Sequence, residues 1–409
     1  MQTIHQIEGG VCAAIGFQAA GLHTGLKKAK KDMALIYSET ACTFAGAFTQ
    51  NTVAAAPVVY DRKIVKESKS VNAVVINSGN ANACTGLQGL KDASTMADSV
   101  AAELGIKGEN VLVCSTGVIG VPLPIDQIKK GITLCSTHLL HSTTAADQAA
   151  HAILTTDKMK KEIAYAVEID GTTIHIGGMA KGSGMIHPNM ATMLSFITTD
   201  ALIEKATLQK LLGSSIQDTY NMISIDGDTS TNDTVLVLAN GQAGGAKIEE
   251  GSKAFAIFKE AFLLVHTHLA KSIVKDGEGA GTFIEMTVSG AKTTQDAKIL
   301  AKSVISSSLV KAAFFGKDAN FGRILCAMGY SGASFSLESL DLSFQSTKGK
   351  IIVVQQGVPL AFDETKAKEI LTEKEVAVTA TLADGSATAT AWGCDLSYEY
   401  VRINGDYRS

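Results

Sequence analysis

The sequence predicts a layered α+β fold, and three observations lead to that class. Short runs rich in β-branched residues alternate with stretches of helical period, so strands and helices are mixed along the chain. Turns such as Asp384-Gly385 separate the strand runs of the C-terminal quarter, which is typical of antiparallel pairing and disfavours a simple doubly wound sheet. A chain of 409 residues corresponds to two or three domains of about 150 residues each and can bury a large core.

The first half of the chain alternates short β-branched runs with amphipathic helices. Runs such as NAVVIN and NVLVC are apolar and β-branched, the stretch before Leu104 is rich in alanine, and Asp170-Gly171 is a hairpin turn signal. The expected elements are a strand at 72–77, a helix at 90–104, a strand at 110–114, a helix over 144–154 and a hairpin across 163–176.

The second half begins with the same alternation and then becomes richer in strands. The expected elements are a strand at 192–197, a helix over 201–219, a strand at 233–239, a long helix near 250–274, a strand at 282–289, a helix near 295–314, and mostly strands thereafter.

Composition and charge exclude several classes of protein. The 36 basic and 40 acidic residues give a net charge of −4, which argues against nucleic acid or an anionic membrane as the main partner. The N-terminus lacks a signal-peptide pattern, no apolar run approaches the ~18 residues of a spanning helix, and the seven scattered cysteines include no C-x-x-C pair. We therefore expect a cytoplasmic protein with reduced thiols and no bound metal.

The 38 glycines against only 5 prolines are unusual, and the densest glycine segment is GGMAKGSGMIHPNMATML at 177–194. A phosphate-binding loop does not fit, because Ser183 stands where the loop lysine belongs, and the segment contains no G-x-G-x-x-G. A tight connection between two strands explains the glycines but leaves Lys181 among them unexplained.

The string KGSGMIHPNMATML closely resembles the self-cleaving loop of the ornithine acetyltransferase family, the glutamate N-acetyltransferases of arginine biosynthesis. The resemblance extends from GGVCAAIGFQAAGLHTGLKK near the N-terminus to RINGDYRS at the end. It implies a cut between Ala191 and Thr192, which divides the chain into 1–191 and 192–409. It also implies the fold of the threonine-nucleophile acyltransferases, with two intertwined fragments paired as an α2β2 heterotetramer.

The expected nucleophile is Thr192. A threonine hydroxyl needs a base, and an N-terminal threonine can use its own α-amine, whose ordinary pKa is about 7.7–8.0. An acyl-enzyme also needs an oxyanion hole. The string CSTGVIG reads on its own as an ordinary strand end, but the resemblance assigns the oxyanion hole to Thr116 and Gly117 within it.

An N-acetylated α-amino acid with a terminal ammonium must be held by charges of both signs. Lys181 suits the carboxylate, and Glu278 in KDGEGA, at the end of a long helix, suits the ammonium. Thr156 remains an alternative to its neighbour Thr155. The resemblance assigns substrate binding to Thr155, Lys181, Thr192, Glu278, Asn404 and Ser409.

Two other polar strings are interpreted as structural. The loop at 77–83 matches the family without a catalytic role. The segment 224–233 looks like a calcium loop, but Thr231 and Val237 replace the glycine and glutamate that an EF-hand requires.

The resemblance implies a ping-pong transfer of acetyl from N2-acetyl-L-ornithine to L-glutamate through acetyl-Thr192. No cofactor is expected, although some family members also accept acetyl-CoA as a co-substrate. Two alternatives remain open: an N-terminal-nucleophile amidohydrolase that uses water as acceptor, and a non-enzymatic protein with a glycine-rich ligand loop.

Overall fold

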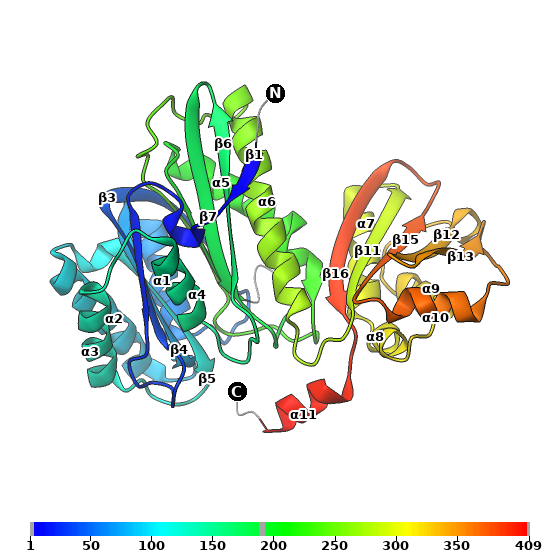
Figure 1. Ribbon diagram of the computed structural model, residues 1–409, viewed down its shortest axis with the longest axis horizontal. Coiled ribbons are helices and arrows are strands. Elements are labelled where there is room, and N and C mark those ends of the chain that lie inside the picture. Colours follow the sequence, from blue (N-terminus) through cyan, green and yellow to red (C-terminus); the bar gives the residue numbers. More distant parts are fainter. Residues whose placement is uncertain (1–3, 188–192, 407–409) are drawn as a thin grey trace.

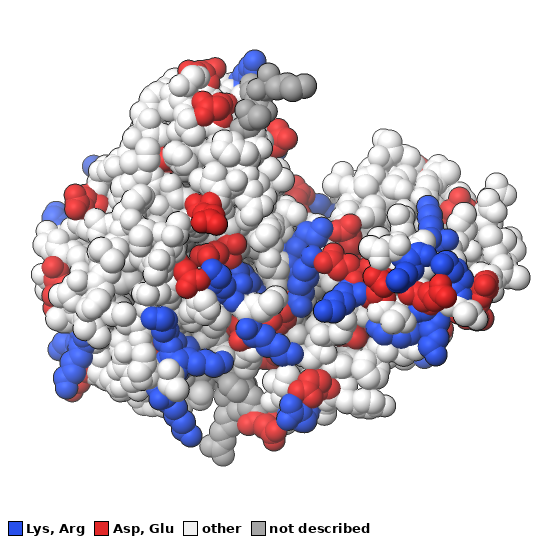
Figure 2. Space-filling view, viewed as in Figure 1, with Lys and Arg blue, Asp and Glu red and all other residues white. Residues whose placement is uncertain are grey.

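The computed structural model describes residues 4–187 and 193–406 of the chain, and these form two lobes (Figure 1). The larger lobe contains a nine-stranded sheet and the smaller lobe a seven-stranded sheet. Both signs of charge are interspersed over the face shown in Figure 2. In the described part of the chain, no helix combines the length and apolarity that a membrane span needs.

The larger sheet has the strand order β1-β6-β7-β8-β10-β3-β4-β5, and β2 pairs with β3. The long strand β3 pairs with β2 along its first half and with β10 along its second half, and its pairing with β4 shifts register between Tyr37 and Cys42. The bounds are β1 Ile4–Ile7, β2 Phe17–Leu22, β3 Met33–Phe48, β4 Val71–Asn80, β5 Val111–Val118, β6 Lys161–Ile169, β7 Thr172–Lys181, β8 Leu194–Thr199 and β10 Thr234–Ala239.

The two halves of this sheet pack face to face between two layers of helices. Alternate residues of β8 show this, because Phe196 lies in an inner cluster with Ile76 of β4, whereas Ile197 lies in an outer cluster with Phe262 of α6. Helices α5 and α6 cover one outer face, α2 and α3 cover the other, α1 packs against β5 and α2, and α4 packs against β2. The bounds are α1 Ala56–Glu67, α2 Gly86–Leu104, α3 Ile125–Ser136, α4 Thr143–Ala152, α5 Lys205–Asp218 and α6 Lys253–Lys275.

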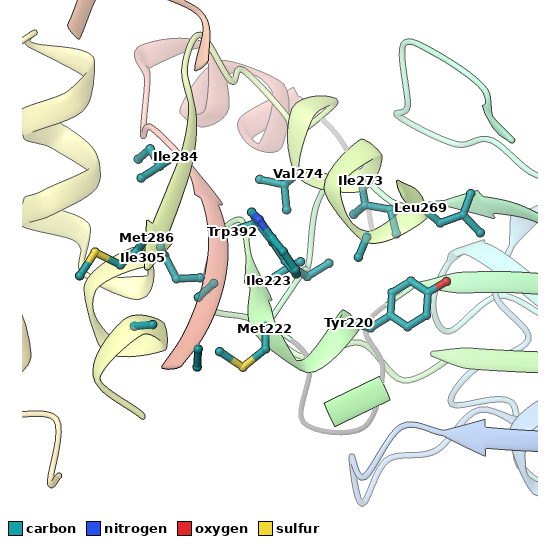
Figure 3. Packing of buried hydrophobic residues seen from close by; sticks show 14 of the residues in the cluster. Tyr220, Met222, Ile223, Leu269, Ile273, Val274, Ile284, Met286, Ile305 and Trp392 are labelled. Carbon is teal, nitrogen blue, oxygen red and sulfur yellow. The ribbon is translucent and has the colours of Figure 1, made fainter. Parts of the chain in front are cut away.

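The smaller lobe shares a hydrophobic core with the larger one (Figure 3). Ile223 of the short strand β9, Trp392 of β16 and Val274 of α6 belong to one buried cluster, so the lobes are joined by packing as well as by the chain. The strand order is β14-β13-β12-β15-β11-β16-β9. The bounds are β9 Ile223–Ser224, β11 Phe283–Ala291, β12 Asp341–Ser346, β13 Gly349–Gln355, β14 Val358–Pro359, β15 Glu375–Thr381 and β16 Ala387–Cys394.

The predicted layered α+β class is confirmed. The elements differ in several places: the first half also contains β1, β2, β3, α1 and α3, where no element was predicted. The helix expected near 295–314 is two helices, because Ser307 adopts an extended conformation and its hydroxyl accepts a hydrogen bond from the Val310 N–H at the start of the second. The C-terminal quarter also contains three helices that the strand-rich prediction omits. The bounds are α7 Thr294–Ser306, α8 Ser308–Phe315, α9 Phe321–Gly329, α10 Glu364–Thr372 and α11 Tyr398–Asp406.

Gly21 of β2 tests the packing of α4, the helix that leads to Thr155. A Cβ at Gly21 would lie 2.0 Å from the carbonyl oxygen of Gln148 in α4, so Gly21→Ala must push backbone apart. We expect a loss of about 1–3 kcal/mol or more in the free energy of unfolding, measured by denaturant titration. Gly213→Ala, inside α5 with nothing within 4 Å of the added Cβ, is the control and should stabilise by up to about 1 kcal/mol. Equal stability of the two variants would contradict this packing.

Candidate active site

A cavity of about 260 Å³ lies where several strand ends of the larger sheet meet the loop after α6 and the helix α11. Its walls come from β5, the loop after α4, both sides of the β7–β8 connection, the loop before β10, the loop after α6, and α11. Segments far apart in the sequence therefore meet in one place.

Every predicted site residue that the structure describes lines this cavity. They are Thr116, Gly117, Thr155, Lys181, Glu278 and Asn404. Ala191, Thr192 and Ser409 lie outside the described residues. Met193, which follows the predicted nucleophile, also lines the cavity, and its carbonyl accepts a hydrogen bond from the Thr234 N–H at 2.9 Å.

The proposed oxyanion residues lie where β5 ends beside β4. Gly117 has φ +133°, and a Cβ there would lie 2.3 Å from the carbonyl carbon of Gly79, so only glycine allows this approach. The Thr116 hydroxyl accepts a hydrogen bond from Lys181 Nζ at 3.4 Å. A hydroxyl that accepts this bond keeps its own proton free to donate into the cavity.

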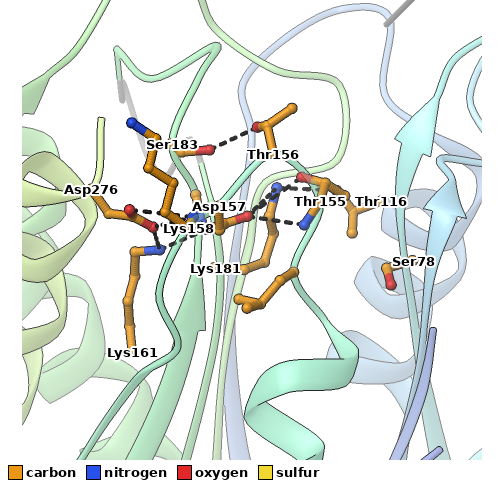
Figure 4. Close-up of polar contacts among 12 residues, drawn as sticks. Ser78, Thr116, Thr155, Thr156, Asp157, Lys158, Lys161, Lys181, Ser183 and Asp276 are labelled. Atoms are coloured by element: carbon orange, nitrogen blue, oxygen red, sulfur yellow. Dashed lines mark hydrogen bonds and ion pairs between the residues drawn. The ribbon is translucent and has the colours of Figure 1, made fainter. Parts of the chain in front are cut away.

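A buried network of four charges fixes three walls of the cavity (Figure 4). Lys161 Nζ lies 2.7 Å from Asp157 and 2.6 Å from Asp276, and Lys181 Nζ lies 3.9 Å from Asp157. Asp157 also accepts the Gly182 N–H at 2.7 Å. Burial alone would raise the pKa of Asp157, but the charges of Lys181 and Lys161 outweigh it and hold this pKa below its usual range.

The two threonines that the sequence could not separate both line the cavity. The Thr156 hydroxyl is 2.7 Å from Ser183 Oγ, whereas the Thr155 hydroxyl has only a long contact of 3.5 Å with Asp157 (Figure 4). The Thr155 hydroxyl therefore has the weaker hydrogen bond within the protein, which favours Thr155 over Thr156 as the ligand contact.

Asp226 holds the loop that precedes the predicted cut, a role that the sequence did not reveal. Its carboxylate accepts the backbone N–H groups of Met185 and Ile186 at 2.6 and 2.8 Å. The segment 224–233, which resembles a calcium loop in sequence, thus holds the glycine segment through hydrogen bonds. The Asp-Gly-Asp string marks a polar loop in the sequence, but it does not show that Asp226 bonds to residues about 40 positions earlier in the chain.

Glu278, in the loop after α6, lies next to α11. It accepts a hydrogen bond from Asn404 Nδ2 at 2.7 Å, and its own N–H donates to the Ser183 carbonyl. A Cβ at Gly184 would lie 2.3 Å from a Glu278 carboxylate oxygen, so this glycine leaves room for the acid.

The cavity is lined by charged side chains of both signs. Lys181 lies beside Thr116, while Asp226, Asp228 and Glu278 lie near Tyr400. Burial, and then the neighbouring Asp226, raise the pKa of Asp228, which reflects this concentration of acid. A ligand with one carboxylate and one ammonium fits such a distribution.

Asp233 is a further cavity residue that sequence reasoning missed. Its side chain is buried, and its Oδ2 atom has no hydrogen-bond partner in the described structure. Burial raises the pKa of this carboxyl well above its usual range. Next to it, Asn232 Nδ2 donates to the carbonyls of Ala81 and Ser115, which ties this loop to the end of β5.

Comparison with known proteins identifies the family. A profile described as the ArgJ family matches residues 18–409. The chain belongs to the ArgJ family. An arginine biosynthesis bifunctional protein ArgJ from Caldanaerobacter subterraneus is 52% identical over 394 residues, covering 96% of this chain and 97% of the relative. The ArgJ of Symbiobacterium thermophilum is 52% identical over 406 residues, covering 98% and 99%.

A solved ornithine acetyltransferase from Mycobacterium tuberculosis, complexed with ornithine, is 40% identical; the match covers 46% of this chain and 100% of that one, with a TM-score of 0.43. The resemblance drawn from the sequence is confirmed, and so is the expectation of an acetyltransferase of arginine biosynthesis. The roles of individual ArgJ residues in this chain stay predictions.

Asp157→Asn tests the buried network. The change leaves Lys161 and Lys181 with one carboxylate fewer, so we expect a loss of about 3–5 kcal/mol in the free energy of unfolding. Because the pKa of Asp157 is lowered in the fold, its contribution should persist from neutral pH down to the ordinary carboxyl range and be lost only at more acidic pH.

The control is Asp147→Asn, which removes the exposed partner of Lys160 and should cost no more than about 1 kcal/mol. Denaturant unfolding at pH 7 and at pH 3 measures both variants. A loss for Asp157→Asn as small as that of the control would contradict the network.

Proposed function

We propose that this chain transfers an acetyl group from N2-acetyl-L-ornithine to L-glutamate through an acetyl ester on Thr192. The observation that carries the proposal is one cavity lined by the cation Lys181, the hydroxyl of Thr116 and the acid Glu278, together with Met193, the residue that follows the predicted nucleophile. Membership of the ArgJ family supports the same reaction.

In the first half-reaction, the Thr192 hydroxyl attacks the acetyl carbonyl while the α-amine of Thr192 takes its proton. Thr116 and Gly117 donate hydrogen bonds to the oxyanion, the carbon–nitrogen bond breaks, and ornithine leaves with the proton. In the second half-reaction, the neutral amine of glutamate attacks the ester carbonyl and the bond between the acyl carbon and Thr192 Oγ breaks. The α-amine of Thr192 takes the proton from the glutamate nitrogen and returns it to Oγ, and N-acetylglutamate leaves. Each half-reaction balances without an external oxidant, reductant or metal.

Binding follows from the same charges. The substrate carboxylate meets Lys181, and the terminal ammonium meets Glu278, whose carboxylate Asn404 orients by hydrogen bonding. Thr155 contributes a hydroxyl, and Ser409 is proposed to complete the site.

Self-cleavage between Ala191 and Thr192 would generate the free α-amine. Strand β7, before the cut, pairs directly with β8, after it, and β8 with β10 lies between β7 and β3. The products 1–191 and 192–409 would therefore share one sheet and stay associated. An α2β2 heterotetramer is proposed for the mature protein, and the seven free cysteines suit the reducing cytoplasm.

A second donor, acetyl-CoA, is proposed because the curated relatives are named bifunctional. The amidohydrolase alternative uses the same nucleophile and differs from the proposed transferase only in the acceptor, which is water instead of glutamate. Acetate release that does not depend on glutamate would favour hydrolysis over transfer.

Thr192→Ala removes the hydroxyl that is proposed both to cleave the chain and to carry the acetyl group. We expect intact-mass spectrometry to find one full-length chain, with no acetyl adduct after N-acetylornithine is added, whereas the unaltered protein shows two fragments and acetyl on the first residue of the second. Thr137→Ala, at the end of α3, is the control and should leave cleavage and acetylation unchanged. A cut, active Thr192→Ala protein would overturn the proposal.

Thr116→Ala removes a proposed oxyanion donor without disturbing the close contact of Gly117 with Gly79. We expect kcat for acetyl transfer to fall about 100- to 1000-fold with a small change in KM, because the donor acts mainly in the transition state. Steady-state kinetics and a thermal melt on the same preparation measure the effect. An unaltered kcat would remove Thr116 from the machinery.

A further inference from the structure

The loop between β2 and β3, residues 23–32, holds four lysines within five positions; we refer to it as the lysine loop. The lysines are Lys27, Lys28, Lys30 and Lys31. Its carboxylate, Asp32, is fully buried and accepts the backbone N–H groups of Thr24, Gly25 and Lys27 at 2.7–3.1 Å. Asp32 therefore fixes the shape of the loop and is turned away from solvent.

The four lysines divide into an inner and an outer pair. Lys27 Nζ donates to the Leu154 carbonyl at 2.5 Å, and Lys31 Nζ donates to the Gly21 carbonyl at 2.9 Å. Lys28 and Lys30 are exposed. Figure 2 shows basic side chains along the lower edge of the larger lobe, where Figure 1 draws the dark blue connection between β2 and β3.

The lysine loop lies directly behind the wall of the active-site cavity. Leu154, which Lys27 contacts, precedes Thr155 in the chain. On its other side, the Lys27 stem lies 3.3 Å from where a Cβ of Gly79 would be, and Gly79 is the residue against which Gly117 packs. One lysine thus touches the residues that support two different parts of the site.

The charges around Lys27 make the loop a favourable place for an anion. Burial lowers the pKa of Lys27 to about 8; the nearby Asp32 raises it, and the positive charges of Lys181 and Lys30 lower it further. An anion bound beside these lysines would offset that repulsion and favour the charged ammonium. Neither N-acetylornithine nor glutamate carries a phosphate, so their binding leaves Lys28 and Lys30 unused.

We infer that the lysine loop binds the phosphate groups of a coenzyme A thioester, the second acetyl donor, while its acyl end enters the cavity. The inference rests on the proposed second donor. A coenzyme A thioester is a polyanion whose phosphates are separated from the acyl group by a long flexible arm. Phosphates bound by the exposed lysines of the loop, with the acyl group inside the adjacent cavity, suit that shape, and lysine is an effective point-charge partner for phosphate.

The test compares two donors that share one acceptor. In a ping-pong reaction kcat/KM for the donor reports only the first half-reaction, so glutamate can serve as the acceptor in both assays. In the double variant Lys28→Glu with Lys30→Glu, we expect kcat/KM for acetyl-CoA to fall about tenfold or more, with kcat/KM for N-acetylornithine unchanged. Lys348→Glu with Lys350→Glu is the control, with the same spacing and charge change at an exposed hairpin of the smaller lobe.

Two further measurements separate the sources of an effect. S-acetyl-N-acetylcysteamine, a thioester without phosphates, should react equally with both variants. Calorimetric titration with coenzyme A should show binding to the unaltered protein and to the control, and loss of binding in the lysine-loop variant.

The inference is overturned if kcat/KM for acetyl-CoA is unchanged in the lysine-loop variant, or if kcat/KM falls equally for all three donors. It is also overturned if coenzyme A does not bind to the unaltered protein. A protein that transfers nothing from N-acetylornithine instead refutes the proposed function. The titration still tests the loop in that case.

Discussion

Four buried charges, Asp157, Lys161, Lys181 and Asp276, set the geometry on which the site depends. Each would cost several kcal/mol if left buried without its partners. They belong to three segments: the connection from α4 to the start of β6, the end of β7, and the end of α6. None of these segments can shift alone without separating opposite charges. The positions of Thr155, Lys181 and Glu278 are therefore coupled before any ligand arrives.

Strand order supplies the second constraint. Leu194 pairs with Lys181 on one side and with Thr234 on the other, so the start of β8 is held from both edges. Gly117, at the end of β5, packs closely against Gly79 at the end of β4. Gly117 and the start of β8 both line the cavity. Backbone hydrogen bonds thus position the start of β8, and the charge network positions the residues around it.

Local patterns predicted part of the fold, and the family resemblance supplied most of the site residues, but both missed features defined by distant partners. The hairpin across β6 and β7 follows from its turn signal, and KDGEGA marked Glu278. Helix α11 was missed because YEYVRI is aromatic and β-branched. Asp226 was rejected as a calcium ligand, and nothing in its own string shows that its acceptors face the N–H groups of Met185 and Ile186. Asp233 is notable only once its burial is known.

Helix α11 also has a consequence for the order of events during synthesis. Tyr400 and Asn404 line the same cavity as Thr116, which is made almost three hundred residues earlier. The ribosome must pass Asn404 before Glu278 receives its hydrogen bond, so the substrate pocket cannot be complete on a nascent chain. Translation that stops before α11 would leave both sheets intact while one wall of the pocket is missing. A complete substrate pocket therefore requires that translation has continued through α11.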